Sequence, residues 1–305
     1  MNLAEKIHEI SLEHCQNGGL ILGQCLSALG RVNGTVPEHP NVIELPMTDV
    51  AGSGFACGMA LAGRKPIFVM RFQDFSILNG SSLINYAAKL KELHGIGCPV
   101  FIRAIASEGL GPVHSSVLHS VFCHFPGFRV VAPTTPSEYQ FIWDQFLEDD
   151  IPYFVSEHRD TYKNLDKGVY PYYNNPDIII LPISACVNEA IKASHVLEED
   201  SVQASVIPIS ILKPFKIPFG IWEAITNCGL VLIVDPSYEY CSIGTTIAYT
   251  LMKNGAYAEV LSCTDNTKLL KEPFKNEYPK FDAIYRKALS MVRGKDIGVR
   301  GRTSP

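Results

Sequence analysis

The chain has 305 residues, of which 47% are hydrophobic and 19% are charged, and its formal net charge is -5. This length and apolar content allow a substantial core and favour two domains. The small net charge and the lack of a dense basic cluster exclude nucleic acid and anionic membranes as expected partners. The first ten residues lack the apolar core of a signal peptide and no apolar run could span a bilayer, so we expect a cytoplasmic protein.

The cysteines and histidines do not predict a metal centre. Nine cysteines occur without a Cys-x-x-Cys pair, which indicates reduced and mostly buried thiols. His114, His119 and His124 are spaced by five residues, and this spacing matches no helical metal face. We expect neither a disulfide framework nor a metal ion bound by this chain.

The first half of the chain, residues 1–165, alternates short apolar runs with longer amphipathic segments. This alternation predicts a parallel sheet with crossover helices. The expected strands cover residues 67–70, 100–105, 129–132 and 153–156. The expected helices cover residues 50–62, 81–93 and 136–147, the last with Thr135 as N-cap and Pro136 as its first residue.

The segment 46–63 places an acid, Asp49, at the start of a helix that is unusually rich in glycine. Each interior glycine costs roughly 1 kcal/mol of helix stability relative to alanine. Gly52, Gly54 and Gly58 therefore indicate close approach of another backbone or of a flat ligand. Taken alone, the segment is better explained by a helix packed tightly on a sheet, with Thr48 as its N-cap and Asp49 stabilised by the helix dipole.

A second α/β unit is expected over residues 177–293, after a connection rich in Tyr, Asn and Pro at 163–176. Its expected strands are 178–182, 204–209, 230–234 and 259–262, and its expected helices are 187–197, 219–226, 243–252 and 281–292. The tail 294–305 is basic and rich in Gly, Ser and Thr, which predicts disorder. The predicted fold class is therefore α/β, with two successive parallel-sheet domains.

Several short motifs follow one another in a fixed order between residues 42 and 159. They are Pro46-Met47-Thr48-Asp49 with the small residues behind it, Lys65-Pro66, Phe75-Ser76, Ile84-Asn85-Tyr86-Ala87-Ala88-Lys89, His114-Ser115 and the run from His124 to Pro133. The ordered set resembles the beta subunit of the decarboxylase component of 2-oxo acid dehydrogenases. That family uses thiamine diphosphate and belongs to the transketolase superfamily. Further along, Leu212-Lys213-Pro214 resembles a turn in the family's C-terminal domain.

The resemblance implies a transketolase-like pyrimidine-binding domain at 1–165 and a transketolase C-terminal-like domain at 177–293. It also assigns three site residues. Asp49 matches the carboxyl group that relays a proton at the cofactor's aminopyrimidine, Phe75 matches an aromatic that lines the aminopyrimidine pocket, and His114 matches an active-site histidine. For Phe75 the alternative is an ordinary core phenylalanine. His114 lies in an expected loop, where functional residues are common.

The chain departs from the family pattern at several acids. The family has Glu at the position of Asp49, so the side chain here is shorter by about 1.5 Å, and a misplacement of about 1 Å can lower a rate on the order of a hundredfold. Either the glycine helix lies closer to the cofactor, or catalysis is impaired. Gln24, Cys25 and Ser81 replace acids that link the two active sites in relatives. Such an enzyme would have independent sites.

No Gly-Asp-Gly segment, which holds the diphosphate and Mg²⁺ in thiamine enzymes, occurs in the chain. In the family this motif lies on a separate alpha subunit. The resemblance therefore implies half of an active site, with thiamine diphosphate and Mg²⁺ clamped mainly by the partner. It further implies self-association of beta chains in a heterotetramer of two alpha and two beta chains.

The leading hypothesis is decarboxylation of a small 2-oxo acid and transfer of the acyl unit to a lipoyl-bearing acyltransferase. One alternative is a subunit of a carboligating enzyme, a split transketolase or a deoxyxylulose phosphate synthase. Another is a non-catalytic assembly subunit, in which Asp49 only stabilises the start of its helix.

Overall fold

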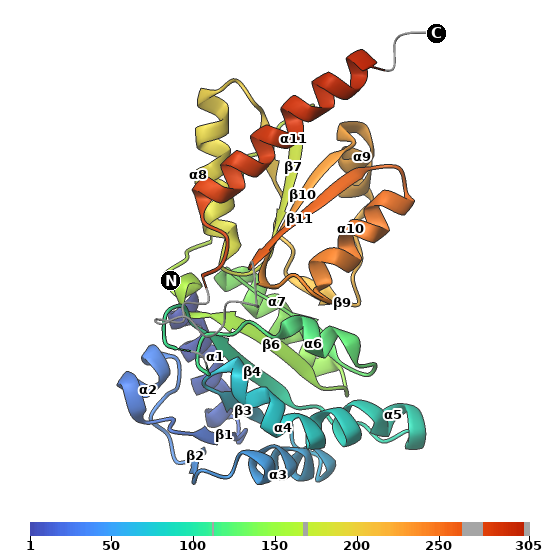
Figure 1. Ribbon diagram of the computed structural model, residues 1–305. Coiled ribbons are helices and arrows are strands. Elements are labelled where there is room, and N and C mark those ends of the chain that lie inside the picture. The colour runs from blue at the N-terminus through green and yellow to red at the C-terminus, as the bar shows by residue number, and fades with distance from the viewer. Residues whose placement is uncertain (112, 167–169, 264–276, 302–305) are drawn as a thin grey trace. The chain divides into compact units, whose positions relative to one another are not determined.

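The computed structural model describes residues 1–111, 113–166, 170–263 and 277–301, with backbone alone beyond residue 294. The chain divides into two compact units (Figure 1). Met1–Asp166 forms the first unit together with the later segment Ser210–Pro214. The expected α/β fold class with two parallel-sheet domains is confirmed.

The first unit contains a seven-stranded sheet in the order β2-β1-β3-β4-β6-β5-β9. The strands are β1 (Ile21–Gln24), β2 (Val42–Leu45), β3 (Ile67–Met70), β4 (Phe101–Ala106), β5 (Arg129–Val131), β6 (Tyr153–His158) and β9 (Ile211–Lys213). β9 is antiparallel to β5, and the other pairings in this sheet are parallel. The four strands predicted for this half are present, whereas β1 and β2 were not predicted.

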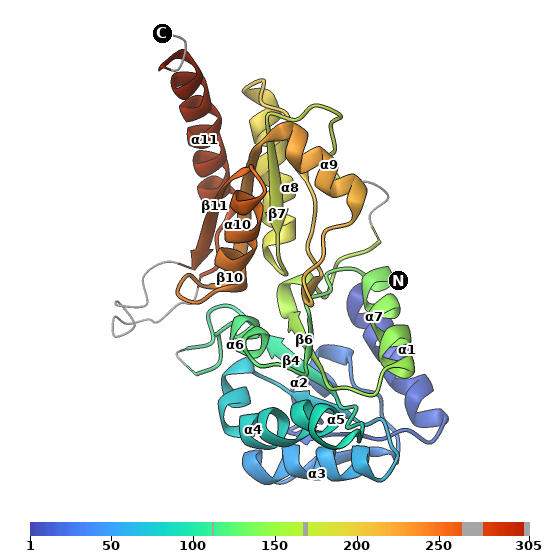
Figure 2. The same ribbon diagram turned by 90° about the vertical axis from the view of Figure 1, so that its right-hand side faces the viewer.

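Helices cover both faces of this sheet. They are α1 (Leu3–Gln16), α2 (Ala28–Gly34), α3 (Asp49–Leu61), α4 (Ser76–Ser82), α5 (Ala88–His94), α6 (His119–His124) and α7 (Pro136–Glu148). Figure 2 shows α1 and α7 together on one face and α3, α4 and α5 on the other. Side chains from α1, α7 and the strands form one apolar core, which includes Ile7, Trp143 and Tyr153.

The glycine-rich helix α3 begins at Asp49, as expected, but Thr48 does not cap it through its side chain. The Thr48 hydroxyl donates instead to the carbonyl of Pro46 at 3.1 Å. A Cβ atom at Gly52 would lie 3.2 Å from Leu45, which lies on the sheet, whereas a Cβ atom at Gly58 would have open space around it. The helix therefore needs a small residue against the sheet at Gly52 and leaves bare backbone exposed at Gly58.

The single helix expected over 81–93 is interrupted. α4 is followed by a π-helical turn, η2 (Leu83–Ala87), and then by α5, which Gly95 ends in the left-handed region at φ 68°. A Cβ atom at Gly127 would lie 1.7 Å from the carbonyl oxygen of Ala88, so only glycine fits where the loop before β5 crosses the helix. Such π-helical turns insert an extra residue and are frequent near functional sites.

The motif Leu212-Lys213-Pro214 lies in the sequence range expected for the second domain, but it completes the sheet of the first unit. The Lys213 ammonium group donates to the carbonyl of Cys123 at 2.9 Å and also to that of Phe125. These carbonyls lie at the end of α6, where the last carbonyl groups of a helix have no N–H donor within the helix. A lysine is therefore favoured in β9, because it binds the carbonyls at the end of α6.

A buried ion pair crosses the centre of the first unit. Arg103 donates to both carboxylate oxygens of Glu157, at 2.7 and 2.9 Å, and to the Thr35 hydroxyl at 2.8 Å. The hydroxyls of Tyr139 and Tyr162 donate to the same carboxylate at 2.9 and 2.6 Å. Burial disfavours the charged guanidinium, but the Glu157 carboxylate outweighs this effect and raises the pKa of Arg103 above its ordinary value.

We expect Arg103→Met to lower the free energy of unfolding by about 3–5 kcal/mol, because it leaves the Glu157 charge buried without its partner. Urea unfolding of the variant measures the change. Arg64→Met, at an exposed position, is the control and should change the free energy by less than about 0.5 kcal/mol. A similar loss in both variants would contradict a special role for the buried pair.

The second unit contains a four-stranded parallel sheet in the order β11-β10-β7-β8. Its elements are β7 (Ile178–Pro182), α8 (Cys186–Glu199), β8 (Ala204–Val206), α9 (Phe219–Cys228), β10 (Leu230–Tyr238), α10 (Ile243–Lys253), β11 (Tyr257–Cys263) and α11 (Phe281–Gly301). Figure 1 shows α8 and α11 on one face of this sheet and α9 and α10 on the other. All eight elements predicted for this domain are present.

The structure differs from the expected disorder of the tail, because α11 continues as far as Gly301. Ile284, Ala288 and Met291 are buried at helical spacing. Once these contacts form a helix, adding further turns is favourable, since each residue fixed then gains a hydrogen bond. Residues 302–305 of the tail lie outside the described residues.

Candidate functional site

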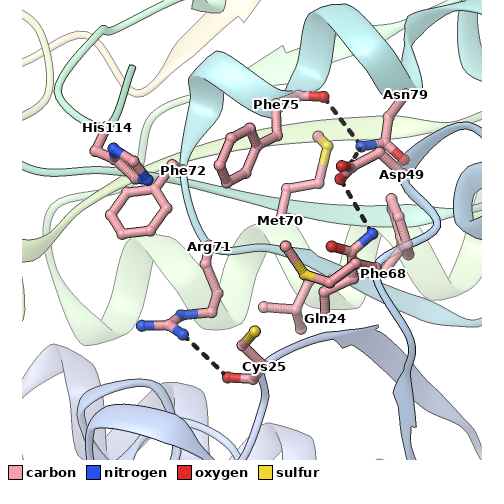
Figure 3. Close-up of a pocket in the computed structure, with 12 residues that line it drawn as sticks. Gln24, Cys25, Asp49, Phe68, Met70, Arg71, Phe72, Phe75, Asn79 and His114 are labelled. Atoms are coloured by element: carbon pink, nitrogen blue, oxygen red, sulfur yellow. Dashed lines mark hydrogen bonds between the residues drawn. The ribbon is translucent and has the colours of Figure 1, made fainter. Parts of the chain in front are cut away.

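A pocket of about 220 Å³ opens in the first unit beside the carboxyl ends of β1 and β3 (Figure 3). Its lining comprises Gln24, Cys25, Met47, Asp49, Phe68, Val69, Met70, Arg71, Phe72, Phe75, Asn79 and His114. Carboxyl ends of parallel strands meet at one edge of a sheet, where ligands of α/β proteins commonly bind. The three site residues predicted from the sequence, Asp49, Phe75 and His114, all line this pocket.

Asp49 is half-buried at the first position of α3, where the helix dipole favours a negative charge. Its Oδ1 atom accepts hydrogen bonds from Gln24 Nε2 at 3.1 Å and from Asn79 Nδ2 at 3.5 Å. Asn79 Nδ2 also donates to the carbonyl of Phe75 at 3.0 Å. The carboxylate is thus held by two neutral amide donors.

Three rings form the wall opposite Asp49. The ring centroids of Phe72 and His114 are 4.5 Å apart, those of Phe75 and His114 are 5.5 Å apart, and all three pairs are edge-to-face. Figure 3 shows the His114 imidazole over the Phe72 ring, with Phe75 beside them. The pocket therefore combines one carboxylate with flat apolar walls, which suits a planar heteroaromatic ring with a basic nitrogen.

The other two histidines do not line the pocket. His119 is buried, and its Nδ1 atom lies 3.2 Å from the Ser156 hydroxyl. His124 is the last residue of α6. Neither residue therefore belongs to the pocket.

Two arginines contact Phe72, and sequence reasoning missed them both. The Arg71 and Arg159 guanidinium carbons lie 5.6 and 4.8 Å from the Phe72 ring centroid. Arg71 donates to the carbonyl of Cys25 at 3.2 Å. Among the described residues, Arg71 Nε and Arg159 Nε and Nη2 are buried without a hydrogen-bond partner. Burial and, to a smaller extent, the Arg71 charge lower the pKa of Arg159.

Buried guanidinium nitrogens without an acceptor are unfavourable, so the surroundings of Phe72, where both arginines lie, are suited to a bound anion. Of these two arginines, Arg71 has a signal in the sequence, because it directly follows strand 67–70 and precedes Phe75. Arg159 follows β6 and is brought to Phe72 only by the fold.

The segment that carries Phe75 also fixes the loop that carries His114. Gln73 is fully buried, and its side chain accepts from the Leu118 amide at 2.6 Å and donates to the Ala104 carbonyl at 3.1 Å. The Asp74 carboxylate accepts from the Ser116 amide at 3.1 Å. The η1 turn (Gln73–Phe75) therefore holds the histidine loop against the pocket.

We expect Gln73→Met to lower the free energy of unfolding by about 1–3 kcal/mol, because it leaves the Leu118 amide and the Ala104 carbonyl buried without partners. Hydrogen exchange at Leu118 should become faster than in the unaltered chain. The exposed Gln16→Met is the control and should change neither quantity. Unchanged protection at Leu118 would show that the loop is held by other contacts.

Within the described residues, no group of three or more His, Cys, Asp or Glu side chains is placed to hold a metal ion. None of the helices in the described ranges combines the length and the apolarity needed to cross a bilayer. Asp49 is the only carboxylate that lines the pocket, so the pocket fits the ring end of a cofactor and does not provide the oxygen ligands of Mg²⁺.

Comparison with known families gives two matches in tandem. The family described as "Transketolase, pyrimidine binding domain" matches residues 17–164, and "Transketolase, C-terminal domain" matches residues 172–268. The first match covers every residue that lines the pocket, from Gln24 to His114, and the second covers much of the second unit.

Curated relatives are subunits of larger enzymes. The chain is 28% identical to the beta subunit of acetoin:2,6-dichlorophenolindophenol oxidoreductase of Cupriavidus necator, over 72% of this chain and 70% of the relative. It is 29% identical to the 2-oxoisovalerate dehydrogenase subunit beta of Bacillus subtilis, over 68% of each. It is 25% identical to the pyruvate dehydrogenase E1 component subunit beta of Rickettsia bellii, over 80% of this chain and 82% of the relative.

Solved structures share the fold at lower identity. A split gene transketolase, described as an inactive beta4 tetramer, aligns with a TM-score of 0.73 at 15% identity, over 96% of this chain and 98% of that one. Transketolase from Campylobacter jejuni aligns with a TM-score of 0.72 at 19% identity, over 94% of this chain and 46% of that one. These likenesses show the fold alone.

Proposed function

Because the chain belongs to the transketolase superfamily, and within it to the beta subunits of the decarboxylating component of 2-oxo acid dehydrogenases, we propose that it supplies the aminopyrimidine-binding half of an active site shared with an alpha subunit. Enzymes of this kind use thiamine diphosphate. The observation that carries the proposal is the Asp49 carboxylate, held at the start of α3 in a pocket walled by aromatic rings.

The residues of the pocket fit the roles that the family resemblance assigns. When bound, thiamine diphosphate supplies a carbanion that attacks the 2-oxo carbon and an electron sink for decarboxylation. Asp49 would hold a proton at the pyrimidine nitrogen, and Phe75 would keep water from that end of the ring. His114, whose ring packs edge-to-face on Phe72, would face the substrate and donate a hydrogen bond to its oxygen.

Exposed apolar side chains on and just before the neighbouring helices α3 and α4 support the proposal of a partner surface. More than half of the residue surface is accessible at Met47, just before α3, at Val50 and Phe55 on α3, and at Ile77 and Leu78 on α4. Exposed apolar patches of this kind mark interaction surfaces. We propose that the alpha subunit covers this face and places the diphosphate and Mg²⁺ ligands over the pocket. Beta-chain self-association in a heterotetramer, a lipoyl-bearing acyltransferase partner and a cytoplasmic location belong to the same proposal.

The two arginines beside Phe72 support an anionic substrate, and they also support the second candidate. Losing CO₂ from a carboxylate held by two cations would be slowed, since the cations stabilise the ground state more than the transition state. Arg71 and Arg159 therefore favour a substrate with another anionic group, such as a sugar phosphate for a split transketolase.

The test is turnover of the complex purified with its alpha partner. The dehydrogenase proposal predicts release of CO₂ from pyruvate or branched 2-oxo acids and acylation of a lipoyl domain. Transfer of a two-carbon unit from a ketose phosphate, without release of CO₂ from 2-oxo acids, would favour the transketolase candidate. No turnover of either substrate class, in a complex that retains the cofactor, would contradict both and favour an assembly role.

A further inference from the structure

We infer that Gln24 and Asn79 are positioning residues, which hold Oδ1 of Asp49 and thereby direct its Oδ2 into the pocket. Both amide groups donate to Oδ1, at 3.1 and 3.5 Å. Within the described part of the chain, Oδ2 has no hydrogen bond. Figure 3 shows the carboxylate between the two amides. The identity of the group that Oδ2 contacts rests on the proposed function. The clamp, meaning the two hydrogen bonds to Oδ1, does not depend on that function.

The orientation of Asn79 is fixed by its surroundings. The residue is 2% exposed, and its two N–H bonds are directed to two acceptors, the Phe75 carbonyl and Asp49. Turning the amide over would place its oxygen against both acceptors, which is unfavourable. The hydrogen bond from Asn79 to the Phe75 carbonyl links the carboxylate clamp to the segment that carries the Phe75 ring.

Gln24 is the last residue of β1, at a position where the family resemblance implies an acid. A second carboxylate 3 Å from Asp49 would repel it, whereas an amide donates to it. With a side chain one methylene shorter than glutamate, Asp49 also has fewer conformations, so two donors suffice to orient it. The two departures from the family pattern, Asp49 and Gln24, are thus explained together as one arrangement of donor and acceptor.

The sharpest variant is Gln24→Glu, which keeps the shape and replaces the donor by a carboxylate. Its charge repels the Asp49 carboxylate, so the carboxyl should titrate at a higher pH than in the unaltered chain. The other titratable or charged side chains that line the pocket are Cys25, from the loop after β1, Arg71, from the end of β3, and His114, from the loop after β4. They are unchanged in the variant.

The experiment has two arms. In the isolated full chain, carbon NMR of labelled aspartate, assigned by loss of the signal in Asp49→Asn, follows the titration of Asp49. In the complex with the alpha subunit, hydrogen–deuterium exchange at the thiazolium carbon gives a pH profile. Gln24→Glu should raise the pH at which Asp49 titrates and shift the pH profile of the exchange to higher pH. Gln24→Met should lower the exchange rate on the order of a hundredfold without changing the KM for substrate by a similar factor.

Gln145→Met, on α7 and outside the pocket, is the matched control and should change neither the titration of Asp49 nor the pH profile of the exchange. Asn79→Asp should act in the same direction as Gln24→Glu. An unchanged Asp49 titration in Gln24→Glu, with the fold intact by circular dichroism, would overturn the clamp. If the NMR shift occurs but even the unaltered complex shows no exchange, the clamp stands and the proposed function fails.

Discussion

Asp49→Asn is expected to abolish formation of the thiazolium carbanion while leaving folding and assembly intact. Asparagine keeps the shape and can still lie between Gln24 and Asn79, but an amide cannot relay the proton. Loss of a general acid or base lowers a rate by about 10²–10⁴-fold. The measurement is deuterium exchange at the thiazolium carbon of the cofactor in the assembled complex.

The control for this variant is Asp144→Asn, an exposed position on α7. Its exchange rate should equal that of the unaltered complex. An unchanged rate in Asp49→Asn would reduce Asp49 to a stabiliser of the start of α3. Asp49→Glu is the complementary probe, since Gln24 lies 3.1 Å from the present carboxylate. The longer side chain should collide with the clamp and lower activity rather than restore the family arrangement.

The chain alone is expected to bind thiamine diphosphate and Mg²⁺ more weakly than about 100 µM, and to retain them only with an alpha subunit. The physical reason is that its pocket offers contacts for the ring end of the cofactor and no oxygen ligands for the diphosphate-bound metal. Isothermal titration calorimetry of the isolated chain and of the complex measures both affinities. A gain of about 4 kcal/mol in the complex corresponds to a thousandfold tighter dissociation constant.

Thiamine without its diphosphate provides an internal control. The isolated chain should bind thiamine and thiamine diphosphate with similar affinity, because it contacts only the part that they share. The complex should distinguish them strongly. Micromolar or tighter affinity for thiamine diphosphate in the isolated chain would contradict a site divided between two subunits.

The sequence alone placed Asp49, Phe75 and His114 in one site, and the structure brings them together because each follows a strand or begins a helix at the same sheet edge. The signal was the ordered set of short motifs that resembles the family. The capping box formed by Asn2 and Glu5 is a further local signal, which marks the start of α1. Sequence patterns could not predict the contact of Arg159 with Phe72 or the three side-chain hydrogen bonds of Gln73, because these depend on distant segments meeting in the fold.

The position of β9 shows the same limit for the domain boundary. Periodicity assigns Ile211–Lys213 to the second domain, since its neighbours in sequence fold there. Its antiparallel pairing with β5 and the bonds from Lys213 to the end of α6 place it in the first unit instead. Neither contact can be predicted from the local composition or from the spacing of apolar residues.

This late strand also has a consequence for biosynthesis. Until the ribosome has passed Pro214, the nascent first unit has β5 as the last strand of its sheet, with the backbone groups that later pair with β9 still open. Unpaired strand borders are templates for association with other chains, and N-terminal domains otherwise begin to fold as they emerge. A protein truncated at Asp166 would keep that border permanently, so aggregation during expression should follow from removing the second half even though no pocket residue is lost.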